Sequence, residues 1–179
     1  MSLYLGAGFK EGIVSLGAVH LDEVDAASSD ADVAGEKARW SQEAVTRTDV
    51  LYFGVRRGRD LVGQFFLHDI DDQEEEALLG YHLFESRSRS LGIGTAALRL
   101  LQRYVSEETT LRRLLAITGI DNQTSRRMCA SCGFAEVGSS REDPLNTVVL
   151  EWRVPGRAGE RLMYPPVIGS TCLTEDARQ

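Results

Sequence analysis

The segment from residue 77 to residue 120 constrains the fold most, because it reads as a strand, a helix and a second strand. Residues 77–84 (ALLGYHLF) and 114–120 (LLAITGI) are apolar runs of strand length. Between them, apolar residues recur at the i, i+3, i+4, i+7 spacing of one helix face, at Ala97, Leu98, Leu101, Tyr104 and Val105. Because a helical crossover lets two strands run parallel, this segment predicts one parallel pair.

The rest of the chain predicts hairpins and two more helical regions. Further strands are expected over residues 13–19, 50–56, 61–68, 134–137 and 147–154. Residues 21–40 read as one or two short helices, and residues 121–132 as another that Gly133 ends in a left-handed conformation. The sequence therefore predicts an α/β (α+β) fold with a mixed, mostly antiparallel central sheet flanked by helices.

Length and composition point to one globular domain. The chain has 179 residues and 42% apolar residues, so we expect a single domain over residues 1–156 and an extension of unknown role over 157–179. The net charge of −7 argues against a general nucleic-acid-binding protein. We find no apolar stretch long enough to cross a membrane and no secretory signal over residues 1–10. Three cysteines, an odd number, do not suggest a disulfide framework, so the cytoplasm is expected.

An acidic run, DIDDQEEE, covers residues 69–76 between two expected strands. The plainer interpretation is a solvated loop tip, since clustered like charges stay in water. The functional interpretation is a lip that overhangs the active site and attracts a cationic amine substrate.

Two glycines stand just before the predicted central helix, in the run Arg89-Ser90-Leu91-Gly92-Ile93-Gly94-Thr95. The first N–H groups of a helix have no intrahelical partner, and the helix dipole favours an anion there. Glycines let a phosphate approach the backbone closely, and Thr95 could cap the helix or donate its hydroxyl. The run lacks the Gly-Lys-Ser/Thr of a nucleotide triphosphate loop and the third glycine of a dinucleotide fingerprint.

Arg89-x-x-Gly92-x-Gly94 resembles the Q/R-x-x-G-x-G/A cofactor motif of the GNAT N-acetyltransferase superfamily. Gly80-Tyr81-His82-Leu83 resembles the strand that lies beside the pantetheine arm of the cofactor in that superfamily. Asn122-x-x-Ser125, followed by Gly133-Phe134, resembles its second conserved block. The resemblance covers residues 13–154 and is strongest to the branch that acetylates protein N-termini, notably those of ribosomal proteins. It implies acetyl-CoA as co-substrate and strands that splay apart where acetyl-CoA enters.

The resemblance gives cofactor-binding roles to the matching positions, which are Leu83, Phe84, Arg89, Ser90, Leu91, Gly92, Ile93, Gly94, Thr95, Asn122 and Ser125. Backbone N–H groups from Ser90 to Thr95 would hold the pyrophosphate. The backbone of Leu83 and Phe84 would pair with the pantetheine and stabilise the oxyanion of the reaction. Asn122 would bond near the pantetheine, and Ser125 would lie beside its sulfur.

The catalytic residues are less determined by the sequence. Many members of the superfamily carry a tyrosine seven residues after the Asn, where it protonates the departing thiolate, but this chain has Cys129. Cys129 is either that acid or a small buried residue, in which case Ser125 or water would serve. His82 and Glu85 are the candidate bases for the acceptor amine. The pair Cys129 and Cys132 lacks further ligands of the zinc type, so no metal is expected.

The sequence therefore predicts an acyltransferase that moves an acetyl group from acetyl-CoA to a primary amine by direct attack in a ternary complex. The acceptor is a protein N-terminus or a small-molecule amine, which the acidic run could select for positive charge. The alternative, favoured by the missing tyrosine, is a module that binds acyl-CoA without catalysis. Homodimers are common in the resembling superfamily, and the oligomeric state of this chain stays open.

Overall fold

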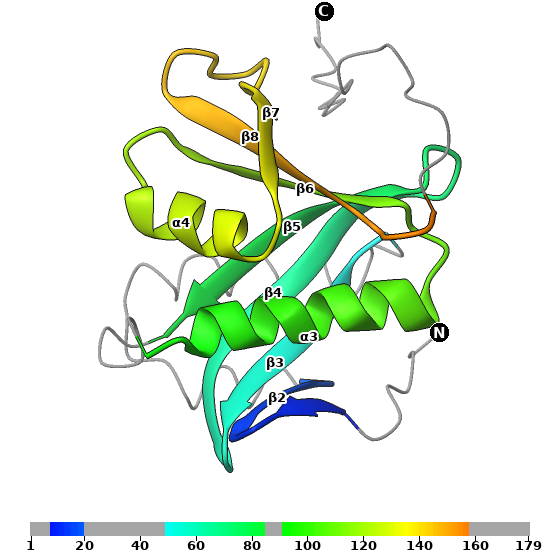
Figure 1. Cartoon of the computed structure of the whole chain (residues 1–179), viewed down its shortest axis with the longest axis vertical. Coiled ribbons are helices and arrows are strands. Elements are labelled where there is room, and N and C mark those ends of the chain that lie inside the picture. Colours follow the sequence, from blue (N-terminus) through cyan, green and yellow to red (C-terminus); the bar gives the residue numbers. More distant parts are fainter. Residues whose placement is uncertain (1–7, 20–48, 85–90, 158–179) are drawn as a thin grey trace, which may run out of the picture.

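The computed structural model describes residues 8–19, 49–84 and 91–157 (Figure 1). In chain order the elements are β1 (Phe9–Glu11), β2 (Val14–Gly17), β3 (Leu51–Arg57), β4 (Asp60–Asp71), β5 (Glu76–Leu83), α3 (Ile93–Glu108), β6 (Arg113–Gly119), α4 (Gln123–Ser131), β7 (Ala135–Gly138) and β8 (Thr147–Arg153). The helices expected over 21–40 lie outside the described residues, as does the segment 158–179.

The described strands form one mixed sheet in the order β1-β2-β3-β4-β5-β6-β8-β7. Only β5 and β6 pair in parallel, and every other neighbouring pair is antiparallel. The parallel pair is the one joined through α3, which confirms the predicted crossover. The strand β1 was not expected, because a three-residue strand is too short to show an alternating pattern. It forms a hairpin with β2 through Gly12, whose φ of 60° suits a glycine in a tight turn.

The two halves of the sheet separate between β5 and β6. Pairing runs only from Glu76 opposite Arg113 to Leu78 opposite Leu115. β5 continues to Leu83 and remains paired with β4 on its other edge, but these later residues have no partner on β6. The expected splayed strands are therefore present, since β5 continues beyond Leu78 without pairing with β6.

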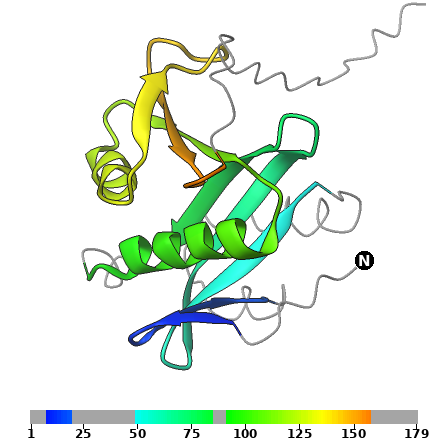
Figure 2. The same ribbon diagram turned by 45° about the vertical axis from the view of Figure 1, so that its right-hand side comes forward.

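Helix α3 lies across one face of the sheet and closes the core there (Figures 1 and 2). All five residues of its predicted apolar face are buried, namely Ala97, Leu98, Leu101, Tyr104 and Val105. They pack against strand residues that include Phe53, Phe65 and Leu67. Gln102 is also buried, and its amide donates a hydrogen bond of 2.8 Å to the carbonyl oxygen of Cys132. This bond ties α3 to the end of α4.

Helix α4 begins and ends where the sequence predicts. The Asn122 side chain caps it, because its Oδ1 accepts a hydrogen bond of 3.1 Å from the Ser125 N–H. Gly133 follows the helix with φ of 81°, the left-handed conformation that commonly ends helices. None of the helices in the described part of the chain is long and apolar enough to span a bilayer.

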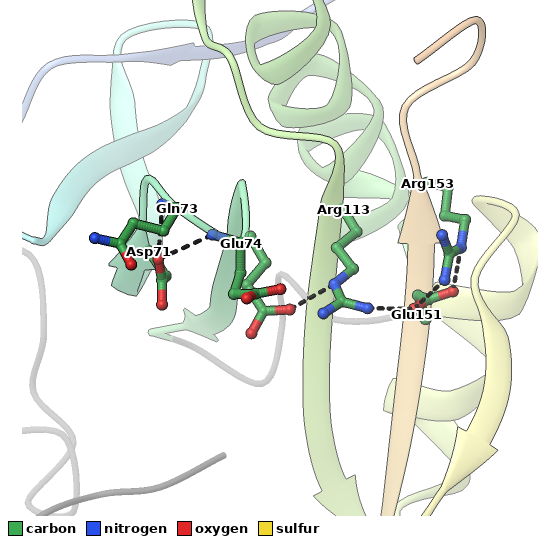
Figure 3. Close-up of polar contacts among 7 residues, drawn as sticks. Asp71, Gln73, Glu74, Arg113, Glu151 and Arg153 are labelled. Carbon is green, nitrogen blue, oxygen red and sulfur yellow. Dashed lines mark hydrogen bonds and ion pairs between the residues drawn. The ribbon is translucent and has the colours of Figure 1, made fainter. Parts of the chain in front are cut away.

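The acidic run forms the tight end of a hairpin. β4 extends to Asp71, β5 starts at Glu76, and the Asp71 carboxylate accepts the N–H groups of Gln73 (2.8 Å) and Glu74 (3.0 Å) (Figure 3). The turn lies at the start of β5, where β5 pairs with β6, whereas the end of β5 leads toward α3. The segment is therefore a short turn rather than a long loop, because backbone pairing continues into the acidic residues.

An ion-pair ladder, defined here as Glu76, Arg113, Glu151 and Arg153, crosses β5, β6 and β8 at this closed end (Figure 3). Arg113 bonds to Glu76 and lies 3.7 Å from Glu151, and its side chain is only 14% exposed. Glu75 in the turn pairs with Arg112. The carboxylates of Glu75, Glu76 and Glu151 are therefore paired with arginines, and these pairs stabilise the sheet rather than attract a substrate.

Candidate cofactor and active site

The N-terminus of α3 presents backbone donors without a side-chain cap. Gly92 is the cap residue, with φ 74° and ψ 0°, and its side-chain-free backbone accepts a bond of 2.9 Å from the Ala96 N–H. The N–H groups of Ile93, Gly94 and Thr95 have no intrahelical partner, and the first turn contains no acidic residue. Such a helix start suits an anion. Thr95 is the third residue of the helix, so the expectation that it caps the helix is wrong.

Gly94 marks the place where α3, α4 and β5 meet. A Cβ at this position would lie 2.8 Å from Met128 Sδ on α4 and 3.9 Å from Leu83 Cδ1 on β5. The absence of a side chain therefore allows α4 to approach the start of α3. The predicted cofactor residues that the structure brings to this end of the molecule are Leu83, Leu91, Gly92, Ile93, Gly94 and Thr95, of which Leu91 is exposed. The predicted cofactor residues Arg89 and Ser90 and the candidate base Glu85 lie outside the described residues.

Alternation along β5 places two candidate residues on opposite faces of the sheet. The Tyr81 ring stacks on Phe65 of the core, with centroids 5.2 Å apart and an interplanar angle of 19°. The His82 ring stacks on Phe66, which is on the other face, at 6.1 Å and 12°. A histidine and a tyrosine that are adjacent in sequence thus face different compartments on the two sides of one strand.

Tyr81, Ser125 and Cys129 form a hydroxyl and thiol cluster between β5 and α4. The Tyr81 hydroxyl donates a hydrogen bond to Ser125 Oγ. Cys129, one helical turn after Ser125, is fully buried. Burial is the main cause that raises the pKa of Tyr81 to about 12 and the pKa of Cys129 to about 11. All three groups are therefore neutral near pH 7.

Phe84 differs from its expected role. Its side chain is 2% exposed and packs against Val19 and Leu61, and its N–H donates a hydrogen bond of 3.0 Å to the Val62 carbonyl. The prediction that this N–H stabilises an oxyanion does not fit the structure, because the N–H already donates to Val62 of the neighbouring strand β4. Leu83 pairs across from Gly63 on β4, and its side chain reaches toward Gly94.

Two other predicted residues have structural partners that the sequence did not reveal. Asn122, expected near the pantetheine, is exposed and caps α4 through Ser125. Cys129 and Cys132 lie three residues apart on one helix, and the Cys132 N–H donates to the Cys129 carbonyl at 3.0 Å. In the ranges 8–19, 49–84 and 91–157 no group of three or more His, Cys, Asp or Glu side chains could hold a metal ion.

Sequence reasoning missed Tyr81 as a site residue. The motif Gly80-Tyr81-His82-Leu83 predicts a role for its backbone beside the pantetheine, and His82 is the side chain in it that we expected to react. Period-two alternation from the buried Ala77 and Leu79 would have placed Tyr81 on the helix side of the sheet, facing α4.

The chain matches the family model of the acetyltransferase (GNAT) domain over residues 19–135. It is also similar to the "Putative ribosomal N-acetyltransferase YdaF" of Bacillus subtilis (strain 168), with 35% identity over 92 residues. That alignment covers 50% of this chain and 48% of the relative, so the match spans about half the length of YdaF.

Solved structures of the same shape include the ribosomal-protein-S5-alanine acetyltransferase from Vibrio fischeri, with a TM-score of 0.67 and 15% identity over 86% of this chain and 100% of that one. Another is RimL, a ribosomal L7/L12 alpha-N-protein acetyltransferase in complex with coenzyme A, with a TM-score of 0.66 and 18% identity over 80% of this chain and 96% of that one. At these identities the likeness establishes the fold.

Proposed function

Because this chain belongs to the GNAT acetyltransferase family, we propose that it transfers the acetyl group of acetyl-CoA to a primary amine. The observation that carries the proposal is the separation of β5 from β6 after Leu78, beside the glycine-capped start of α3. Acetyl-CoA has an extended pantetheine arm and an anionic pyrophosphate, and these two features can bind both parts at once.

The residues present fit such a ligand. The edge of β5 after Leu78, which has no pairing with β6, can pair with amide groups of an extended arm, as an added strand would. The uncapped N–H groups of Ile93, Gly94 and Thr95 would hold the pyrophosphate. Leu83 and Met128 would line the apolar stretch between these two places.

Acetyl-CoA supplies a thioester carbonyl to which the amine nitrogen bonds as the C–S bond breaks. His82 is our candidate for accepting the amine proton, since it faces the side of β5 opposite to Tyr81. Ser125 is our candidate for meeting the developing negative charge on sulfur. Cys129 is better suited to packing, because it is fully buried and burial raises its pKa to about 11, which makes the thiol a weaker proton donor. Glu85 stays a second candidate base.

We propose a protein N-terminus as the acceptor class to test first, because the relatives named above are described as ribosomal-protein acetyltransferases. The paired carboxylates of the acidic turn give no reason to require a cationic acceptor. The same proposal places the protein in the cytoplasm, where thiols such as Cys129 and Cys132 stay reduced.

Thiol release from acetyl-CoA, measured with a panel of peptides bearing free N-termini and with small amines, tests the proposal. Peptide-dependent release of one thiol per acetylated product, identified by mass spectrometry, is expected. Calorimetric binding of acetyl-CoA without turnover of any amine would instead favour the non-catalytic acyl-CoA-binding module.

A further inference from the structure

We propose that Tyr81 positions Ser125 as the hydrogen-bond donor to the sulfur of departing CoA, an inference that rests on the acetyltransferase function proposed above. The sequence alone left this role to Cys129, Ser125 or water, and the helix position that resembles the family's tyrosine is the buried Cys129. The structure supplies a phenol from another element, the strand β5.

The bond between Tyr81 and Ser125 fixes the direction of the serine hydrogen. Tyr81 donates its only hydroxyl hydrogen to Ser125 Oγ, so one serine lone pair is used and the serine hydrogen must point elsewhere. The Tyr81 ring is held by its stacking on the fully buried Phe65. Ser125 is therefore oriented as a donor by a rigid neighbour rather than left to rotate.

The pair lies where the sulfur arm would pass. Tyr81 belongs to the segment of β5 that has left β6, and Ser125 lies in the first turn of α4. Asn122 fixes that turn through the Ser125 N–H, and Met128, almost one turn further along α4, meets the start of α3 at Gly94. The donor thus lies between the part of β5 that has separated from β6 and the helix start that we assign to the cofactor.

The chemistry requires only a hydrogen bond. When the C–S bond breaks, its electron pair stays on sulfur and the Ser125 hydroxyl stabilises the thiolate, which takes a proton from water after release. The amine proton leaves to the base on the opposite face of β5. The groups facing the Tyr81 hydroxyl are Ser125 and Cys129, both neutral, so Tyr81 keeps its proton and Ser125 keeps its orientation throughout catalysis.

Steady-state kinetics of Tyr81→Phe test the positioning role. The variant keeps the ring on Phe65 and removes only the hydroxyl. We expect kcat to fall about tenfold to a hundredfold, with the KM for acetyl-CoA within about threefold, as for loss of a hydrogen bond to a charged group. Tyr104→Phe, the same change in the core of α3, is the matched control and should leave kcat unchanged.

A double-mutant cycle identifies the route of the effect. If Tyr81 acts through Ser125, Tyr81→Phe should have no further effect in a Ser125→Ala background, whereas independent residues would give effects that multiply. Multiplying effects would overturn the proposal, as would Tyr81→Phe matching Tyr104→Phe.

Titration of the bound CoA thiol gives a readout that does not depend on turnover. Thiolate absorbance in the ultraviolet is followed against pH for the complex with CoA, minus the complex with desulfo-CoA, which cancels Cys129 and Cys132. The thiol pKa should be about one unit lower in wild type than in Tyr81→Phe or in Ser125→Ala. Equal values in all three proteins would refute the proposal, and Ser125→Ala keeps the test valid if Tyr81→Phe does not fold. Absence of CoA binding by wild type would overturn both proposals, whereas wild-type turnover with an unchanged Tyr81→Phe variant would overturn this one alone.

Discussion

Gly94 offers a direct test of how the proposed cofactor site works, because a side chain there should act in two separable ways. A Cβ at this position would lie 2.8 Å from Met128 Sδ, well inside the ~3.5–4.0 Å of ordinary contact between non-bonded atoms. Every substitution should therefore push Met128 aside. A negatively charged side chain should in addition repel a pyrophosphate held by the first N–H groups of α3.

The magnitude of the charge effect follows from Coulomb's law. Two unit charges ~4 Å apart repel by about 4 kcal/mol at an effective dielectric constant of ~20 and by about 1 kcal/mol in bulk water. Gly94 is partly exposed, so we expect about 2 kcal/mol for Gly94→Asp, which corresponds to a loss of about thirtyfold in acetyl-CoA affinity. Gly94→Asn has nearly the same shape without the charge and is the matched control.

Isothermal calorimetry with acetyl-CoA at low and high salt is the assay. We expect Gly94→Asp to bind about thirtyfold more weakly than Gly94→Asn at low salt, with the difference shrinking at high salt. Adding Met128→Ala to both variants should recover the loss of thermal stability and leave the charge difference in place. Equal affinities for the Asp and Asn variants, both folded, would refute the assignment of the α3 N-terminus to the pyrophosphate.

Three further predictions concern other parts of the structure. Cys129→Ala should keep turnover within about threefold. It should also lose less stability at high pH than wild type, because the pKa of Cys129, raised from 9.0 to about 11 in the folded protein, gives a contribution to stability that is fully present below pH 9.0 and is lost as the pH rises toward about 11. Thermal unfolding measured against pH tests this difference. Gln64→Leu should raise the melting temperature, because both amide atoms of this fully buried side chain lack a hydrogen-bond partner within the described part of the chain; a lower melting temperature would contradict it. Arg113→Met should cost about 2–3 kcal/mol in chemical denaturation by removing the arginine partner of Glu76 and leaving Glu151 with Arg153 alone, whereas the more exposed Arg153→Met should cost under about 1 kcal/mol; equal costs would show that the ladder adds nothing beyond surface pairs.

The sequence predicted much of the fold because its strongest signals are local. The apolar face of α3 follows from spacing within one helix, and the C-terminal end of α4 follows from the conformational freedom of Gly133. The parallel pairing of β5 and β6 follows from the crossover between them. The strand β1 and the reach of β4 into the acidic run were missed, since both depend on pairing with a neighbouring strand rather than on their own residues.

The cofactor site could be predicted from a local run of residues, whereas the cluster of Tyr81, Ser125 and Cys129 could not. By itself the sequence determined the glycines at the start of α3, because a phosphate loop is a continuous run of residues whose function rests on its own backbone. Only the tertiary structure showed that Tyr81 contacts Ser125 and that the Phe84 N–H donates a hydrogen bond within the sheet. It also showed that the acidic turn lies at the start of β5, where β5 pairs with β6. Each of these depends on which face and which end of a strand meets another element, and that is decided by packing between residues distant in sequence.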